Sequence, residues 1–370
     1  MKVLHLISSC GLFGAERVIL TLASQNNGID FWVGALNNHH NPHLEIIQEA
    51  KTAGLKTIVF DSRGQVDFKT VSSIQKFLNE NSIDILHTHN YKSDIMGFWA
   101  TRFSYTQWVA TNHVWHSTDS KMRFYETIDA IVLKFAKMIF TVSQEIKDDM
   151  LQKGFKENHI HVIHNGINIS QFNPKTARVQ LRADWKVSDN EILLTIVGRL
   201  APEKGHEVLF KAMTQITKQH PNVKLLVIGD GPLRNNLEEQ IKNLNLSNHI
   251  ILAGLREDMP DVYRSCDILV NASYKEGLPM TILEAMASGL TIIATRVGAV
   301  PQVIREGENG ILLEAGNSEV LAQAVISLLN DPSQRQILAQ QAYKDVCRDF
   351  SDQIMFDKYK QLYEAVLTDK

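Results

Sequence analysis

The chain has 370 residues, of which 44% are hydrophobic and 21% are charged, and its formal net charge at pH 7 is −3. This length exceeds what one hydrophobic core comfortably holds, so the composition indicates a soluble globular protein of two domains. A general nucleic-acid binder would be strongly basic, and the charge therefore argues against nucleic acid as a partner.

The cysteines and the N-terminal residues indicate a cytoplasmic protein. Cys10, Cys266 and Cys347 lie far apart and form no CxxC pair, which fits a reducing compartment. The first nine residues become polar too soon for a signal peptide and are typical of a strand. No apolar run approaches the length of a membrane span. We therefore expect a cytoplasmic protein that could still touch the cytoplasmic face of a membrane.

Strand-like runs followed by helical patterns recur along the chain, which is the signature of parallel sheets covered by helices. A first series of strands is expected at residues 3–7, 31–36, 56–60, 83–87, 108–111, 139–142 and 161–163, with a helix at 15–24. A second series is expected at residues 192–197, 223–228, 250–252, 268–270, 291–294 and 310–313. The helices of that second series are expected at residues 207–220, 233–244, 259–264, 280–288, 320–330 and 333–348.

The boundary between the two series is expected after the Asn165-Gly166 turn, because residues 171–189 are polar. We therefore predict an α/β protein with two doubly wound parallel-sheet domains, at residues 1–168 and 169–350. In such domains, ligands bind at the carboxyl ends of the strands.

One basic amphipathic stretch, residues 121–138, has two interpretations. Its lysines alternate with apolar residues such as Ile131 and Phe135. The pattern fits a helix that lies on an anionic membrane near a lipid-borne substrate. It also fits a helix that covers the first sheet with its lysines in water, and we favour this second interpretation.

Two glutamates, Glu276 and Glu284, stand eight positions apart across a turn that opens a helix. Gly277 breaks the preceding strand pattern, and Pro279 suits the first helical position, where a missing N–H is tolerated. The free amides of the helix start favour an anion such as a phosphate, and carboxylates suit hydroxyl groups. A sugar attached to a nucleotide carries these groups in that order. The alternative is a capped amphipathic helix with two solvated glutamates.

A second candidate loop follows the expected strand at residues 192–197 and reads GRLAPEKG over residues 198–205. Gly198 lets the backbone approach a ligand closely. Arg199 and Lys204 could clamp a diphosphate, the arginine through a fork of hydrogen bonds and the lysine as a compact charge. The alternative is a surface loop in which Lys204 pairs with Glu203.

Taken together, these motifs resemble one enzyme family. They are GRL and EKG within residues 198–205, the Glu276–Glu284 pair, LVIGDGP at 226–232, Asn165-Gly166, Val142-Ser143 and GAER at 14–17. The combination resembles the retaining nucleotide-sugar glycosyltransferases of the GT-B fold, in the large family 4 group (glycosyl transferases group 1). It covers nearly the whole chain but does not define one sugar. The resemblance implies two facing Rossmann-like domains with a cleft between them, and a C-terminal helix at 351–370 that packs back onto the first domain.

The resemblance also implies roles for the matching residues on the donor side. Arg199 and Lys204 would hold the donor diphosphate and stabilise it as it leaves. Glu276 would bind hydroxyls of the transferred sugar, and Glu284 would bind the ribose. The other donor-binding positions, which include the base-holding stretch at 254–256 and the loop that closes over the diphosphate, are Gly14, Gly198, Arg256, Gly277, Leu278, Pro279, Met280 and Thr281.

On the acceptor side, His113 ends an expected strand at the position where matching family members have a histidine that faces the reacting sugar. It is therefore placed with the catalytic residues, although a lone strand-end histidine is more often structural. His87 and His89 end another strand with their rings on the same side, because alternate strand residues share a face. A metal site would need further ligands, so no metal is expected. The acceptor-side candidates are Glu16, His87, His89 and Asn90.

The chain departs from the family pattern at two places. Phe13-Gly14 stands where paired glycines are common, and Asn168 stands where an aspartate often follows Asn-Gly-x. The first departure would alter the acceptor loop, and neither breaks the donor-site pattern.

No two aspartates occur at positions i and i+2, so the Asp-x-Asp metal clamp of the other main transferase fold is absent from the sequence. We expect metal-independent transfer without a cofactor. The expected reaction moves a hexose or N-acetylhexosamine from a UDP-sugar, or else from GDP-mannose, to a saccharide or lipid-linked acceptor in polysaccharide, lipopolysaccharide or glycolipid synthesis. The alternatives are a nucleotide-sugar epimerase and a non-catalytic nucleotide-sugar-binding module.

Overall fold

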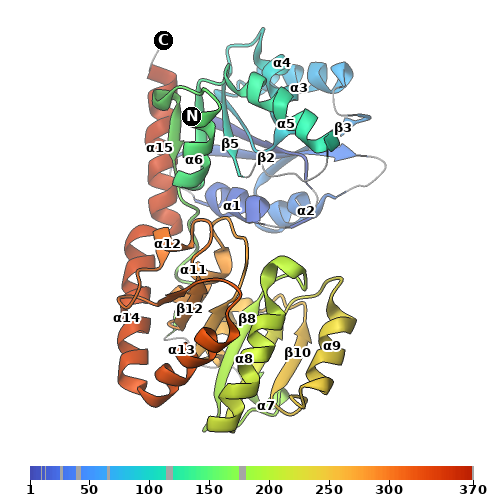
Figure 1. Ribbon diagram of the computed structural model, residues 1–370. Coiled ribbons are helices and arrows are strands. Elements are labelled where there is room, and N and C mark those ends of the chain that lie inside the picture. Colours follow the sequence, from blue (N-terminus) through green and yellow to red (C-terminus); the bar gives the residue numbers. More distant parts are fainter. Residues whose placement is uncertain are drawn as a thin grey trace. The chain divides into compact units, whose positions relative to one another are not determined.

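The computed structural model describes residues 1–9, 11–12, 14–25, 28–38, 43–64, 67–113, 120–174 and 181–368, without the side chains of residues 120–124. The chain divides into two compact units, which are described separately (Figure 1). The first unit comprises Met1–Gly166 and Asp352–Lys370, and the second comprises Ile167–Ser351. The observed division after residue 166 lies two residues before the predicted one.

The first unit is built on a seven-stranded parallel sheet in the order β3-β2-β1-β4-β5-β6-β7. Its strands are β1 (Lys2–Ile7), β2 (Asp30–Asn38), β3 (Lys56–Ser62), β4 (Ile85–Thr88), β5 (Gln107–Asn112), β6 (Met138–Thr141) and β7 (Ile160–Val162). Its helices are α1 (Gly14–Ala23), α2 (Glu45–Thr52), α3 (Phe68–Glu80), α4 (Tyr91–Thr101), α5 (Ser120–Leu133), α6 (Gln144–Gln152) and α15 (Asp352–Thr368), with a short 3-10 turn, η1 (Glu157–His159).

The second unit is built on a six-stranded parallel sheet in the order β10-β9-β8-β11-β12-β13. Its strands are β8 (Ile192–Val197), β9 (Val223–Ile228), β10 (Ile250–Gly254), β11 (Ile268–Asn271), β12 (Thr291–Thr295) and β13 (Ile311–Leu313). Its helices are α7 (Leu181–Asp184), α8 (His206–Gln219), α9 (Arg234–Asn243), α10 (Met259–Ser265), α11 (Met280–Ala287), α12 (Val300–Val303), α13 (Ser318–Asn330) and α14 (Pro332–Asp349), with a 3-10 turn, η2 (Pro202–Lys204).

Helices cover both faces of each sheet, which is why the strands are nearly continuous apolar runs. In the first unit, one core layer contains residues of α1, α2 and α15, and the other contains residues of α3, α4 and α6 (Figure 1). In the second unit, α8, α9 and α13 contribute to one layer, and α10, α11, α12 and α14 contribute to the other. The α/β fold with two parallel sheets is confirmed.

The basic amphipathic stretch is helical only in its first part, since α5 ends at Leu133. Leu133 is buried in the core layer beneath α3 and α4, so α5 covers the sheet. Ile131 is nevertheless 58% exposed and Phe135 is 61% exposed. The side chains of residues 121–124 lie outside the described part. None of the helices described has both the length and the apolar character to cross a membrane.

Candidate functional site

In each sheet the strand order reverses next to the first strand of the unit, and ligands of doubly wound sheets bind at such points. In the second unit the reversal lies between β8 and β11, which pair in parallel. Gly198 and Arg199 follow β8 directly, and the segment from Ser273 to Glu276 follows β11. The fold therefore brings together two loops that lie about 75 residues apart in the sequence.

Glu276 is the centre of a hydrogen-bonded group at this edge. Its Oε1 accepts from Lys204 Nζ at 2.7 Å, from Ser273 Oγ at 2.6 Å and from Asn271 Nδ2 at 3.1 Å. The Glu276 side chain is 8% exposed, whereas that of Lys204 is 24% exposed. Lys204 therefore pairs with Glu276 and not with Glu203. The alternative, a surface loop held by a Lys204–Glu203 pair, is wrong.

Glycines allow this group to assemble tightly. The aliphatic chain of Lys204 lies over Gly198, where an added Cβ would meet Lys204 Cδ at 3.4 Å. Gly298 adopts φ +53°, and a Cβ there would lie 1.9 Å from the Glu276 carbonyl oxygen. A side chain at residue 298 would thus displace the backbone that carries Glu276.

Arg199 lies in the same loop as Lys204, directly after Gly198, and is exposed. Among the described residues, its guanidinium makes no hydrogen bond or ion pair, in contrast to Lys204. An exposed cation that lacks a counter-ion suits a ligand with negative charge.

Helix α11 begins close to Glu276 and carries Glu284. Pro279 is the residue before the first helical turn, with φ −74° and ψ 114°, so the expected first helical position falls one residue later, at Met280. Glu284 is 9% exposed, and its Oε2 accepts from the Tyr263 hydroxyl at 2.9 Å. Gly277 is exposed, Leu278 and Pro279 are buried, and Thr281 is half-buried.

Arg256 lies after β10, the edge strand of this sheet. Its Nε and Nη2 donate to the two carboxylate oxygens of Asp258 at 2.8 and 2.5 Å, and this bidentate pair raises the pKa of Arg256. Its guanidinium also lies 5.8 Å from the ring centre of Trp185. Arg256 is therefore fixed in place, and the neighbouring Leu255 is 80% exposed.

In the first unit, the predicted residues lie around the end of β1. Gly14 is the exposed first residue of α1, and Glu16 is buried with its Oε1 accepting from Ser9 Oγ at 3.0 Å. Asn90 caps α4, since its Oδ1 accepts from Ser93 N at 3.2 Å while its Nδ2 donates to the Ser8 carbonyl at 2.9 Å. Asn90 thus joins the end of β1 to the start of α4.

Four histidines meet at the same edge of the sheet. His5 on β1 lies opposite His87 on β4 in the parallel register, while His89 and His113 follow β4 and β5. The rings of His87 and His89 lie side by side with centroids 4.2 Å apart, as their spacing predicted. His89 Nε2 is 2.9 Å from His5 Nδ1, and His89 Nδ1 is 3.3 Å from His113 Nε2.

His87 is completely buried and bonded through both ring nitrogens. Nδ1 lies 2.6 Å from the Tyr363 hydroxyl of α15, and Nε2 lies 2.6 Å from Thr111 Oγ1. This geometry favours a role inside the core over the acceptor-facing role that the sequence suggested. Nitrogen atoms of His5, His87 and His89 lie within 4.8 Å of one another, the spacing of a metal-binding group. Hydrogen bonds engage both ring nitrogens of His87 and of His89 and the Nδ1 of His5, whereas His5 Nε2 has no partner among the described residues.

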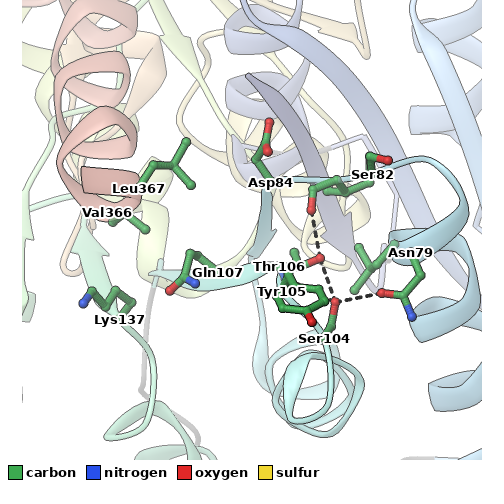
Figure 2. Close-up of a pocket in the computed structure, with 12 residues that line it drawn as sticks. Asn79, Ser82, Asp84, Ser104, Tyr105, Thr106, Gln107, Lys137, Val366 and Leu367 are labelled. Carbon is green, nitrogen blue, oxygen red and sulfur yellow. Dashed lines mark hydrogen bonds between the residues drawn. The ribbon is translucent and has the colours of Figure 1, made fainter. Parts of the chain in front are cut away.

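The first unit also has a pocket of about 700 Å³, shown in Figure 2. Ser104 lies at its wall and donates to Asn79 and Thr106 (Figure 2). Asp84 and Gln107 line it at the start of β4 and β5, which is the opposite edge of the sheet from His89 and His113. Because ligands of such sheets bind at the carboxyl ends, this pocket is separate from the candidate site.

Two family models match the chain and together cover most of it. The model described as Glycosyltransferase Family 4 matches residues 14–171, and the one described as Glycosyl transferases group 1 matches residues 178–345. The chain belongs to the family 4 glycosyltransferases. This glycosyltransferase has the GT-B fold, and the family match leaves no support for a nucleotide-sugar epimerase.

Similar proteins include a UDP-Gal:alpha-D-GlcNAc-diphosphoundecaprenol alpha-1,3-galactosyltransferase of Escherichia coli. The two sequences are 26% identical, and the alignment covers 100% of this chain and 98% of the relative. An N,N'-diacetylbacillosaminyl-diphospho-undecaprenol alpha-1,3-N-acetylgalactosaminyltransferase of Campylobacter jejuni is 26% identical over 88% and 90% of the two chains. Among solved structures, Anabaena Alr3699/HepE in complex with UDP aligns with a TM-score of 0.88 at 22% identity, covering 99% and 100% of the two chains.

Sequence reasoning missed four residues of the glycosyltransferase that support the predicted ones. Asn271 and Ser273 both bond Glu276, and their spacing of two residues at a strand end was a usable signal. His5 is a polar residue within the apolar run of the first strand, and this was a second usable signal. Gly298 left no comparable signal, because only the fold brings it to Glu276.

Proposed function

We propose that this glycosyltransferase moves a hexose or N-acetylhexosamine from a UDP-sugar to an acceptor hydroxyl, with retention of configuration and without a metal ion. The single observation that carries the proposal is the arrangement of cations after β8, where Lys204 is bonded to Glu276 and Arg199 is exposed in the same loop. The UDP donor is favoured over GDP-mannose, because the name of the Escherichia coli relative specifies UDP-Gal as its donor.

In the proposed reaction the bond between the sugar carbon and the diphosphate oxygen breaks first. Negative charge then develops on the diphosphate, and Arg199 and Lys204 stabilise it. The acceptor oxygen attacks from the face that the diphosphate leaves, and its proton passes to the departing phosphate oxygen. Glu276 holds sugar hydroxyls and Glu284 holds the ribose, while His113 faces the reacting sugar.

The positive charge of the two side chains replaces that of a metal ion in this scheme. We expect Arg199→Ala and Lys204→Ala each to lower kcat by at least about 100-fold, as for the loss of one group that stabilises developing charge. Transfer of radiolabelled sugar to an acceptor, with and without EDTA, measures both claims. Lys218→Ala, which removes an exposed lysine at the end of α8, is the matched control.

Near-normal transfer by both variants would exclude the proposed roles, and loss of transfer in EDTA would exclude metal independence. A chain that binds UDP but neither transfers nor hydrolyses the sugar would instead be the non-catalytic binding module. Thermal stabilisation by a panel of nucleotide sugars identifies the donor, because a bound ligand raises the melting temperature by mass action.

We also propose a lipid-linked acceptor and contact with an anionic membrane through the first unit, at the cytoplasmic face. The names of two relatives specify diphosphoundecaprenol acceptors. Large apolar side chains are exposed around α4 and α5, namely Trp99, Phe103, Tyr105, Ile131 and Phe135. Such residues suit the interface of a bilayer, where their apolar side chains are buried among the headgroups.

Sedimentation with vesicles containing anionic lipid tests this contact. The wild-type chain is expected to bind, and the Phe103→Ser and Phe135→Ser double variant is expected to lose most of the binding, because each removed ring takes away buried apolar area. Equal binding of the two proteins would contradict the proposed surface. Ile337→Ser, at an exposed position of α14 in the second unit, is the control.

A further inference from the structure

A row of three histidine rings runs from the interior of the first unit to His113. His5 Nδ1 lies 2.9 Å from His89 Nε2, and His89 Nδ1 lies 3.3 Å from His113 Nε2. His5 is completely buried and His89 is 4% exposed, while His113 is half-buried at the outer end. The row therefore links a core residue of β1 to the residue after β5.

All three rings are neutral at pH 7. Burial lowers the pKa of His5 to about 3 and that of His113 to about 4. Burial also lowers the pKa of His89 well below its ordinary value, and the neighbouring histidines add to this effect. A neutral imidazole carries one N–H and one nitrogen that accepts, so the three rings share three protons.

Only two proton arrangements satisfy both ring-to-ring hydrogen bonds. In one, His5 Nδ1 donates to His89 and His89 Nδ1 donates to His113, so that His113 carries its proton on Nδ1. In the other, every proton moves to the opposite nitrogen, and His113 Nε2 donates. Any mixture of the two loses one bond, because two N–H groups or two lone pairs then face each other. The tautomers of the three rings are therefore coupled.

The far end of the row distinguishes the two arrangements. His5 Nε2 is buried and has no hydrogen-bond partner among the described residues. Its ring packs against Phe31, with centroids 5.4 Å apart. A buried N–H without an acceptor is rarer than an acceptor that is not fully used. The arrangement that leaves His5 Nε2 without a proton is thus favoured.

We propose that His89 and His5 are positioning residues that hold the proton of His113 on Nδ1. The inference rests on the proposed function, in which His113 faces the reacting sugar. With Nδ1 protonated and Nε2 bonded to His89, His113 presents a hydrogen-bond donor to a sugar oxygen. It does not serve as a base there, because its only lone pair is turned inward.

NMR of the full-length chain with ¹⁵N-labelled histidine at pH 7.5, without substrate, tests the coupling. We expect the wild-type His113 to show one tautomer, with Nδ1 protonated. His5→Asp replaces the donor at the far end by an acceptor for His89 Nε2, and it is expected to reverse the tautomer of His113, so that Nε2 carries the proton. His5→Asn keeps an N–H near the position of Nδ1 and is expected to preserve the single tautomer. His161→Leu, which removes another histidine of the first unit, is the matched control.

Kinetics give a second readout. Loss of the hydrogen bond that His113 Nδ1 donates is expected to lower kcat of His5→Asp about tenfold, with little change in KM for the donor, and His5→Asn is expected to keep kcat near the wild-type value. A wild-type His113 protonated on Nε2, or a tautomer unchanged by His5→Asp, would overturn the inference. If His5→Asp does not fold, the wild-type spectrum still decides the proton position. Failure of the wild-type chain to transfer any sugar would reject the proposed function, whereas the tautomer is measured without substrate.

Discussion

At the scale of single residues, Glu276 is held by only one of its two oxygens. Lys204, Ser273 and Asn271 all donate to Oε1. Within the described residues, Oε2 accepts no hydrogen bond. A carboxylate fixed by one oxygen keeps the other available for a ligand hydroxyl, which fits the role that the family resemblance implies. The sequence supplied Glu276 and Lys204 as candidates, but their direct pairing depends on the neighbouring positions of β8 and β11.

Replacing Glu276 by glutamine tests the roles of these two oxygens separately. The glutamine carbonyl can still accept the bonds that Oε1 receives, so the melting temperature is expected to change little. The amide NH₂ would replace Oε2 and cannot accept from a sugar hydroxyl, and kcat/KM is expected to fall about 10- to 100-fold. Steady-state transfer assays and thermal unfolding measure the two effects. An unchanged kcat/KM would show that Oε2 does not contact the sugar.

At the scale of elements, α4 and α5 are joined through two buried carboxyl groups. Asp94 on α4 is 2% exposed, and Asp129 on α5 is 1% exposed. Burial, together with the charge and hydrogen bond of Asp129, raises the pKa of Asp94 well above its ordinary value of 3.8. Two carboxylates this close cannot both ionise without cost, so they share a proton. The sequence did not show that Asp94 and Asp129 are neighbours, because they belong to two helices that meet only in the fold.

The Asp94→Asn substitution tests this pair. Because the pKa of Asp94 is raised in the folded state, its contribution to stability is present below about pH 4 and is lost as the pH rises through the folded value. Asparagine keeps a donor for Asp129 without the proton equilibrium. We expect Asp94→Asn to raise the free energy of unfolding at pH 7.5 by roughly 1–2 kcal/mol, and less at pH 5. Urea unfolding at both pH values measures this change.

A lower stability of Asp94→Asn at pH 7.5 would contradict a shared proton. Asp148→Asn, at an exposed position of α6, controls for the general loss of one negative charge.

At the scale of the whole molecule, the chain returns to its first unit after completing the second. Helix α15 contributes Met355, Phe356, Tyr359, Tyr363 and Val366 to the core layer with α1 and α2. Burial of such side chains contributes about 1.5–3 kcal/mol each, and their sum approaches the net stability of about 5–15 kcal/mol that is typical of a domain. The C-terminal helix is therefore part of the first fold.

Deleting residues 352–370 is expected to unfold the first unit and spare the second. Differential scanning calorimetry should then lose one transition, while a second remains and shifts upward on addition of UDP. The remaining transition is the internal control. Retention of both transitions in the truncated chain would contradict the role of α15 in the first core.

The sequence alone determined where the strands lie along the chain, because buried parallel strands are apolar runs bounded by turns. Residues 192–197 and 223–228 were predicted with the bounds that β8 and β9 have. It also supplied the motifs that identify the family, since glycines and charged residues at strand ends have few other uses. Sequence could not supply strand order, because hydrophobic pattern carries no information on which strand lies beside which.

Tertiary structure decided the contacts that depend on this order. Lys204 meets Glu276 because β8 lies beside β11, and His5 meets His87 because β1 lies beside β4. His87 was expected on the acceptor side, but in this sheet it is buried and contacts Tyr363. The same strand pairing places His89 between His5 and His113. Residue type and local pattern thus fixed which chemical groups the chain has, and the pairing of distant strands decided which of them touch.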